Sequence, residues 1–382
     1  MQNAPQLASR QAVIDGAQAL TRNAGRLPDP ELVTGVDNLP VNGPDAWSLG
    51  NDFMTMRKVG VMQSFTSSTK RAAQRDAAQA QLSVAESEST QTQLEISLSA
   101  ADAWVSRFAA QSALQHLQEL KPDIDLQASS ALGALRSGRG SAMDALSARA
   151  AVSDLDDRIL EAQRAVVASK AELARWIGAA AERPLGPAPS FRMLPAAGEE
   201  ILASLHHHAV LRAYDARIVA AEREVELAKA EKRPDWSAEL AYARRGPGFS
   251  NMVSLEVRAS LPLWPGNRQN PAIRAKQAAV RQFEADREAQ LRMHTVEVSQ
   301  MIAAWEAARD RVALYERERL PLARQRSQLA LASLQAGQLD LRQTLASLAD
   351  EIEVRRMYAE LLGTLGHAWA SLNFLDSAGD AP

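Results

Sequence analysis

The sequence predicts a mainly helical protein in which one unit, a strand hairpin followed by a long coiled-coil helical hairpin, occurs twice. Three landmarks of the first half recur in the second half at offsets of 197, 199 and 199 residues: Arg71 as Arg268, Pro122 as Pro321, and Gly138 as Gly337. An offset of about half the chain indicates two copies of one supersecondary unit rather than a solenoid. The long tracts between these landmarks are rich in Ala, Gln, Arg and Glu, a composition typical of long helices and coiled coils.

The composition excludes several classes of function. Basic and acidic residues nearly balance, 43 against 46, and the net charge of −3 gives no electrostatic reason to expect a nucleic-acid partner. The chain has no cysteine, so it has neither a disulfide nor a thiolate metal site. No run of about 18 apolar residues is present, which argues against a transmembrane helix. Membrane-spanning strands remain compatible with the sequence because they are only alternately apolar.

The landmarks divide the chain into consecutive segments. They are an N-terminal helix shortened at its front end (1–27), a strand hairpin (28–66), a helical hairpin (67–178) with its tip at 136–142, a Pro/Ala-rich linker (179–200), a helix (201–233), a second strand hairpin (234–264), a second helical hairpin (265–375) with its tip at 335–342, and a tail (376–382).

Each strand hairpin is predicted from alternating apolar and polar residues. In the second copy we expect strands at about 235–244 and 252–263, and in the first copy at about 30–37 and 53–65. A two-stranded ribbon is marginal in water. We therefore expect these hairpins to need strands from other chains.

The helical arms show coiled-coil spacing. Apolar residues step by 4 and 3 from Leu94 to Phe108, from Leu155 to Trp176, and from Leu345 to Trp369, with Arg355 as one charged interruption. A period of 3.5 residues predicts left-handed packing of helices against one another. At 1.5 Å per residue, each arm is expected to span on the order of 100 Å.

Gly138 and Gly337 mark the points at which the arms reverse. A glycine supplies the left-handed residue that ends a helix. Ser141 and Asp340 follow these glycines at positions suited to cap the next helix.

No catalytic or cofactor site is predicted. We find no nucleophile–base pair, no phosphate-binding glycine loop and no paired carboxylates, so we expect neither an enzyme nor a cofactor. The run His206, His207 and His208 is a weak candidate for metal binding. Consecutive helical side chains point about 100° apart, which favours a solvated helix start over a metal site.

The order of elements resembles the TolC-type outer-membrane factor family, the outer membrane efflux proteins. The segments that carry this resemblance are "LPDPEL" and "RPDWSAEL" before the strands, "RASLPLWPGNR" after them, "LPLARQRSQLALASLQAGQLDL" at the second tip, and "HHHAVLRAYDARIVAAEREVELAKA". The resemblance covers residues 7–375 and is greatest to the heavy-metal RND efflux branch of CzcC- and CusC-like proteins.

The resemblance implies a homotrimer in the outer membrane. Each chain would give four strands to a shared 12-stranded β-barrel in the lipid, and its helices to a 12-helix α-barrel across the periplasm. The partners would be a periplasmic adaptor (membrane fusion) protein and an inner-membrane RND transporter. The aromatic residues Trp236, Tyr242, Phe249 and Trp264 would lie at the membrane interfaces.

The resemblance also places the glycine turns at the periplasmic tip, where the pore narrows. The tip and gate candidates are Gly138, Asp144, Gly337, Asp340, Arg342 and Gln343. The family often has an acidic residue six positions after the glycine, and here Asp144 in the first copy corresponds to Gln343 in the second. We expect the constriction to carry a charge pattern of its own.

One departure concerns export. The first residues, "MQNAPQLASRQAV", lack the basic and apolar regions of a signal peptide, and no lipid-accepting cysteine is present. Placement in the outer membrane therefore assumes a leader, and the first copy is expected to be truncated at its front end.

The function predicted is that of a passive trimeric exit duct of a tripartite efflux system, with divalent heavy-metal cations as the substrate. One alternative is a duct for drug efflux or type I secretion. The alternative from another class is a soluble coiled-coil scaffold, which would leave the amphipathic strands without a use.

Overall fold

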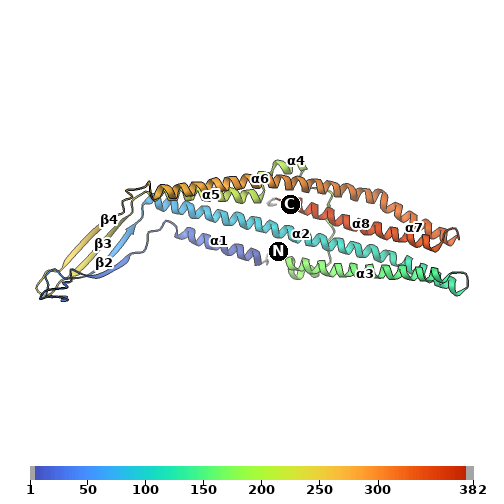
Figure 1. Cartoon of the computed structure of the whole chain (residues 1–382), viewed down its shortest axis with the longest axis horizontal. Coiled ribbons are helices and arrows are strands. Elements are labelled where there is room, and N and C mark those ends of the chain that lie inside the picture. Colours follow the sequence, from blue (N-terminus) through green and yellow to red (C-terminus); the bar gives the residue numbers. More distant parts are fainter. Residues whose placement is uncertain (1–4, 376–382) are drawn as a thin grey trace. The chain divides into compact units, whose positions relative to one another are not determined.

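The computed structural model describes residues 5–375 and confirms a mainly helical chain with one small antiparallel sheet (Figure 1). The first copy comprises α1 (Pro5–Asn23), β1 (Glu31–Asp37), β2 (Met56–Phe65), α2 (Ser68–Arg136) and α3 (Ala142–Ile177). After a 3-10 turn (Gly178–Glu182), the second copy comprises α4 (Gly198–Ala203), a 3-10 turn (Leu205–His207), α5 (Ala209–Ala230), β3 (Trp236–Arg244), β4 (Met252–Ala259), α6 (Gln269–Leu314), a π-helical turn (Tyr315–Arg319), α7 (Leu320–Gln335) and α8 (Leu341–Asn373). The predicted tail at 376–382 lies outside the described residues.

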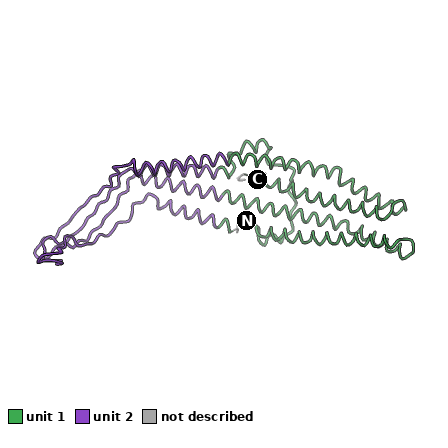
Figure 2. Tube along the Cα trace, viewed as in Figure 1, with its two compact units in different colours: residues 1–8, 90–211, 290–382 green, residues 9–89, 212–289 purple. Residues whose placement is uncertain are grey.

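The described residues form two compact units, coloured separately in Figure 2. Unit 1 comprises residues 5–8, 90–211 and 290–375, and contains the ends of both helical hairpins. Unit 2 comprises residues 9–89 and 212–289, and contains the four strands. Helices α2 and α6 contribute residues to both units.

The sheet of unit 2 joins the two copies. Its order is β1-β2-β3-β4, and every neighbouring pair is antiparallel. The prediction that both hairpins depend on strands from other chains is therefore wrong for one edge of each hairpin, because β2 pairs with β3 from Arg57↔Arg244 to Phe65↔Trp236. Among the described residues, β1 and β4 remain the open edges.

Two strands are shorter than the alternation of residues predicted. β4 ends at Ala259 rather than at 263, because Pro262 has no N–H to give to a ladder. β2 begins at Met56 rather than at 53, since the backbone N–H of Met54 donates to Asp52 Oδ1 at 2.6 Å in a local turn.

Three residues of the predicted coiled-coil seams, Leu155, Leu348 and Ile352, pack with three residues of α2 outside those seams in a core of unit 1. Six buried side chains from α2, α3 and α8 make up this cluster: Leu117, Leu120, Ile124, Leu155, Leu348 and Ile352. The charged interruption at Arg355 is accommodated by ion pairs, at 2.5 Å to Glu351 and 3.2 Å to Glu119. Glu351 is itself buried and accepts a hydrogen bond from Ser327.

The segment predicted as a linker packs firmly against the helices of unit 1. Phe191 is buried and its backbone O accepts a hydrogen bond from Trp305 Nε1 at 2.8 Å. The buried Arg107 donates to the backbone O of Ala181 at 2.6 Å and of Arg183 at 3.1 Å. These bonds fix the start and the middle of the segment to helices that are distant in the sequence.

The helix predicted over 201–233 is wrong as a single element. Helix α4 ends at Ala203 and α5 begins at Ala209, with a 3-10 turn between them. The backbone of His208 is extended, at φ −64° and ψ 142°. The break turns the His208 side chain into the interior of unit 1, where it is 2% exposed.

The two prolines inside the arms act differently. Helix α2 runs through Pro122 without interruption. Pro321 lies at the start of α7, immediately after the π-helical turn Tyr315–Arg319. A wider turn accommodates the missing N–H and the bulk of the proline ring, so the helix departs from α-helical geometry beside the proline only in the second copy.

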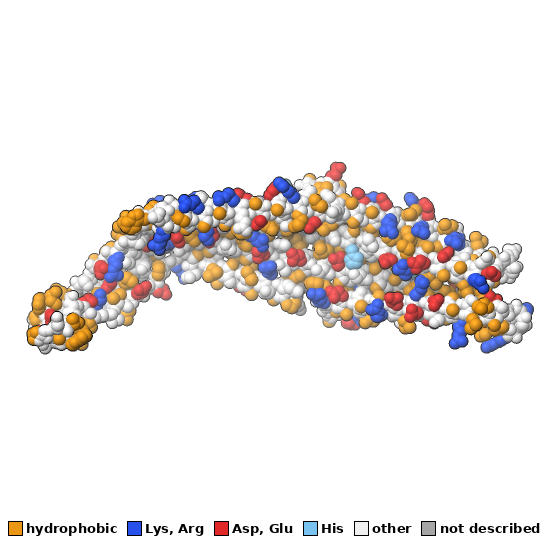
Figure 3. All heavy atoms as spheres, viewed as in Figure 1, with side chains coloured by type: hydrophobic (Ala, Val, Ile, Leu, Met, Phe, Trp, Pro, Cys, Tyr) orange, Lys and Arg blue, Asp and Glu red, His pale blue; other side chains and the backbone are white. Residues whose placement is uncertain are grey.

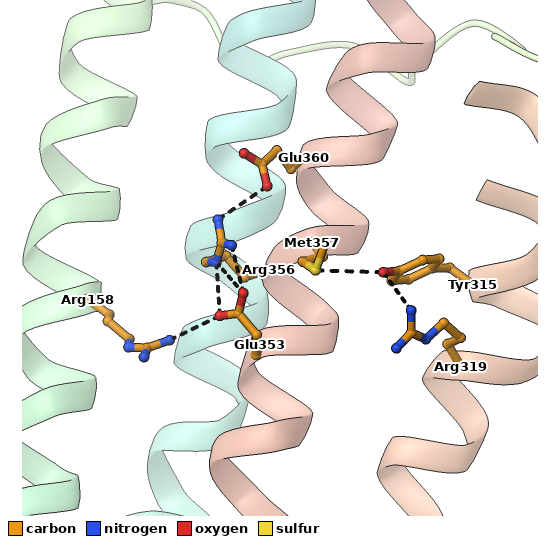
Figure 4. Close-up of polar contacts among 7 residues, drawn as sticks. All are labelled: Arg158, Tyr315, Arg319, Glu353, Arg356, Met357 and Glu360. Atoms are coloured by element: carbon orange, nitrogen blue, oxygen red, sulfur yellow. Dashed lines mark hydrogen bonds and ion pairs between the residues drawn. The ribbon is translucent and has the colours of Figure 1, made fainter. Parts of the chain in front are cut away.

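Polar contacts connect the two hairpins along the side of the bundle (Figure 4). Glu353 on α8 pairs with Arg356 at 2.7 Å and with Arg158 on α3 at 3.6 Å. The hydrogen bond from Arg356, which outweighs the opposing effect of partial burial, lowers the pKa of the Glu353 carboxyl. These side chains are close to half exposed, so each pair contributes about 0–1 kcal/mol.

Candidate functional site

One face of the sheet is apolar and exposed. Residues paired across neighbouring strands share a face, and the register gives four rows on this one: Phe65, Trp236 and Ala259; Gln63, Ala238 and Val257; Leu32, Val61, Leu240 and Leu255; and Thr34, Val59, Tyr242 and Val253. Leu255 and Val253 are 72% and 71% exposed. A contiguous apolar surface of this kind indicates contact with a membrane or with another protein.

The opposite face of the sheet is polar and internally paired. The carboxylate of the buried Glu239 on β3 lies 3.8 Å from Lys58 Nζ on β2 and 3.1 Å from Arg258 on β4. Lys58 also lies 3.5 Å from Asp37 on β1. The sheet therefore has one face suited to lipid and one suited to water, which is the alternation that membrane-spanning strands require.

The predicted interface aromatics lie near both ends of the strands. Trp236 begins β3, and Trp264 follows β4 with 75% of its surface exposed. At the other end, Tyr242 lies near the end of β3, and Phe249 lies in the following loop against the Arg245 guanidinium, 5.3 Å away. Figure 3 shows further hydrophobic side chains over these hairpin loops, whereas the helices carry interspersed charges. The placement of the four predicted aromatic residues at membrane interfaces stays a prediction.

Both helical tips have the backbone geometry expected for helix reversals. Gly138 and Gly337 have φ of +72° and +70°, a region that favours glycine. After each glycine the chain folds back on the helix it leaves, with Arg139 N donating to Ala134 O at 2.9 Å and Gln338 N to Ser333 O at 2.9 Å. These bonds satisfy carbonyl groups at the ends of α2 and α7.

The caps predicted for the returning helices are confirmed. Ser141 Oγ accepts from the backbone N–H of Asp144 at 3.0 Å, and Asp340 Oδ1 accepts from that of Gln343 at 2.7 Å. Asp144 also accepts a hydrogen bond from the Ser141 hydroxyl at 2.7 Å. Two of the proposed gate residues, Asp144 and Asp340, thus have a structural role at helix N-termini, where negative charge is favourable.

Replacing Ser141 or Asp340 by alanine should destabilise the first turn of its helix by about 0.5–2 kcal/mol. Hydrogen exchange of the backbone amides of Asp144 and Gln343 would measure the effect. Ser147→Ala, one turn further along α3, is the matched control and should leave exchange unchanged. If these amides exchanged at the same rate in the Ser141, Asp340 and Ser147 variants, the two caps would not stabilise the first turns of α3 and α8.

A groove of about 510 Å³ lies between the two tips within unit 1. Its apolar lining includes Leu126, Ala131, Leu334 and Leu341, and its charged lining is Arg139, Asp144 and Asp340. The structure therefore brings Asp144 and Asp340 into one groove, but it does not bring Arg342 or Gln343 there. Arg139 was not predicted from the sequence, although it directly follows the reversal glycine.

The histidine run does not form a metal site in the part of the chain that the structure describes, where no group of three potential ligands occurs. Instead, His208 Nδ1 lies 2.9 Å from Nε2 of His294, which is also buried. The prediction of a solvated helix start is therefore wrong for His208. Its partner lies 86 positions away, on a helix that carries no second histidine, so spacing could not reveal the pair.

A serine, a histidine and an aspartate meet on the surface of unit 1. His367 Nδ1 lies 2.8 Å from Asp102 Oδ1, and its Nε2 lies 3.3 Å from Ser106 Oγ. The Ser–His–Asp arrangement has the order of a hydrolytic triad and was not predicted from the sequence. Ser106 lies within the long helix α2, whose backbone N–H groups are bonded within the helix. The α2 backbone around Ser106 therefore offers no N–H donor to an oxyanion.

Comparison with known proteins finds one family model that matches the chain. The model of the outer membrane efflux protein family matches residues 1–179, which span the first copy. The second copy repeats its order of elements.

Solved structures share the complete fold. The outer membrane protein VceC from Vibrio cholerae is 21% identical, with a TM-score of 0.78 over 98% of this chain and 94% of its own. A membrane protein from Pseudomonas aeruginosa is 16% identical, with a TM-score of 0.82 over 98% and 88%. CusC is 16% identical, with a TM-score of 0.81 over 98% and 89%. At these identities the similarity establishes the fold.

A search of curated proteins found no match. Among the described residues, none of the helices is both long and apolar enough to cross a membrane.

Proposed function

We propose that the protein is the outer-membrane exit duct of a tripartite efflux system and that it works as a homotrimer. The observation that carries the proposal is the four-stranded sheet, which has an exposed apolar face, a polar face rich in ion pairs, and open edges at β1 and β4. Open edges within lipid leave backbone N–H and C=O groups unpaired, which costs several kcal/mol for each group.

Closure of the sheet by three chains satisfies these groups. Pairing of β4 of one chain with β1 of the next would leave no edge. Four strands from each of three chains give a closed barrel with an even number of strands, as bacterial outer-membrane barrels have. The apolar face of the sheet then contacts lipid, and the polar face, which contains Lys58, lines the duct.

The helical hairpins would form the periplasmic part of the same duct. Their tips, with the groove that contains Arg139, Asp144 and Asp340, would meet a periplasmic adaptor and, through it, an inner-membrane RND pump. Energy would come from the pump. The duct itself would select coarsely, by the width and charge of its narrowest part.

Divalent heavy-metal cations are the substrate class that we propose. The support is the sequence resemblance to the heavy-metal RND efflux branch.

The test uses the chain expressed with an export leader and extracted from the outer membrane in detergent. We expect a trimer, and we expect deletion of the gene to sensitise cells to zinc, cobalt and cadmium, with sensitivity reversed by the intact chain. Sensitivity to organic compounds, or loss of a secreted protein, would assign the duct to those substrates instead. A soluble monomer obtained without detergent would refute the duct and favour a scaffold.

A further inference from the structure

Two arginines face each other at the loop end of the apolar face. Arg57 of β2 is the direct cross-strand partner of Arg244 of β3, and both side chains are exposed. They lie in the row next to Val59 and Tyr242, so they share the face of the apolar rows. All other side chains that the register places on this face are uncharged.

This pair has no counter-ion within the described part of the chain. Like charges directly opposite each other destabilise a strand pair, yet no ion pair or hydrogen bond involves either guanidinium. The neighbouring Arg245 differs, because it donates to the backbone O of Phe53 and lies over the Phe249 ring. On the polar face, Lys58 and Arg258 both reach Glu239. Arg57 and Arg244 therefore present two guanidinium groups to an external anion.

The position of the pair indicates what that anion is attached to. The row of Phe65 and Trp236 lies eight residues along the strand from the row of the arginines, which is about 26 Å at 3.3 Å per residue. With the usual strand tilt, the height is about 20 Å, near the apolar band of about 25 Å in outer-membrane barrels. The strands connect to the helices at the tryptophan end and to loops at the arginine end. The arginines thus lie at the boundary of the leaflet away from the helices.

We propose that Arg57 and Arg244 bind the phosphate of an anionic glycolipid of the outer leaflet, with its acyl chains on the apolar rows. The proposal rests on the proposed insertion of this sheet in the outer membrane. Guanidinium groups suit phosphate because they offer paired N–H donors in a fixed fork. The adjacent residues Val59, Tyr242 and Val253 are exposed and apolar, as contact with acyl chains requires. Free phosphate would contact only the two guanidinium groups and not the apolar rows.

The experiment compares lipid binding by the full-length protein in detergent. The variant is the double change Arg57→Gln and Arg244→Gln. The control is Arg274→Gln with Arg281→Gln, which removes two exposed charges from α6. Native mass spectrometry would follow titration with bisphosphorylated lipid A, with enzymatically dephosphorylated lipid A and with inorganic phosphate.

We expect the double variant to bind bisphosphorylated lipid A roughly 10- to 100-fold more weakly than the wild type, and the control to bind as the wild type does. Dephosphorylated lipid A should bind both proteins equally weakly, and inorganic phosphate at millimolar concentration should not displace the lipid. Equal binding by wild type and variant, or displacement by free phosphate, would overturn the proposal. A wild-type protein that never enters the membrane fraction would instead refute the proposed function.

Discussion

Replacing Gly60 by valine should separate the two copies within the sheet and prevent the chain from inserting into the outer membrane. Gly60 lies in β2 on the polar face, opposite Ala241 of β3. A Cβ atom there would lie 2.6 Å from Ala241 Cβ and 2.7 Å from the backbone O of Leu240. A backbone atom of the adjoining strand cannot move away without breaking the hydrogen bonds between β2 and β3. We therefore expect Gly60→Val to destabilise the folded protein by about 3 kcal/mol or more, the upper end of the range for overpacked cores.

The matched control is Gly35→Val in β1. Gly35 lies on the same face of the sheet, next to Lys58, but a Cβ there would meet only Lys58 Cε, at 3.7 Å. Valine also favours strands, so this variant should stay within about 1 kcal/mol of the wild type. Membrane fractionation and the thermal unfolding midpoint in detergent would measure both variants. If Gly60→Val inserted and unfolded as Gly35→Val does, the close β2–β3 contact would not exist in the protein.

The fold was predictable because its periodicities are local. The alternating residues of β3 and β4 and the 4-3 spacing around Leu155 and Leu348 fix the element types. Gly138 and Gly337 then locate the reversals. The pairing of β2 with β3 was not predictable, because two amphipathic hairpins can pair with each other or with those of another chain, and the apolar pattern is the same in both cases.

The polar contacts of the interior were the least predictable part. His208 and His294 meet because the chain breaks at Ser204–His208, and the break is stabilised by burial rather than by a proline or glycine signal. Asp102, Ser106 and His367 meet only once α2 and α8 are packed together. Such contacts depend on the exact rotation of each helix about its axis. A hydrophobic pattern indicates which side of a helix is buried, but not that rotation.

Replacing Leu255 by arginine should destabilise the membrane-inserted protein by about 2–4 kcal/mol, the cost of a basic side chain on the lipid face near the bilayer midplane. Leu255 belongs to the row halfway between Trp236 and Arg244. The matched control is Ser254→Arg, whose side chain lies on the polar face of the same strand and should cost less than about 1 kcal/mol. Both positions are exposed in the single chain, so only the surroundings of the assembled sheet can distinguish them. Urea titration of folding in lipid vesicles would measure the difference.

A third variant, Leu255→Ala, separates lipid from protein as the partner of this face. Against another protein chain, the truncation would leave a cavity and cost about 2–5 kcal/mol. Against lipid, mobile acyl chains refill the space, so only the lost transfer free energy of the removed methyl and methylene groups counts, about 0.8 kcal/mol for each. A large loss for Leu255→Arg together with a loss of at most about 2.4 kcal/mol for Leu255→Ala, which removes three carbons, identifies lipid. Large losses for both would identify a protein interface, and equal small losses for Leu255→Arg and Ser254→Arg would mean that neither face of β4 is in contact with the membrane.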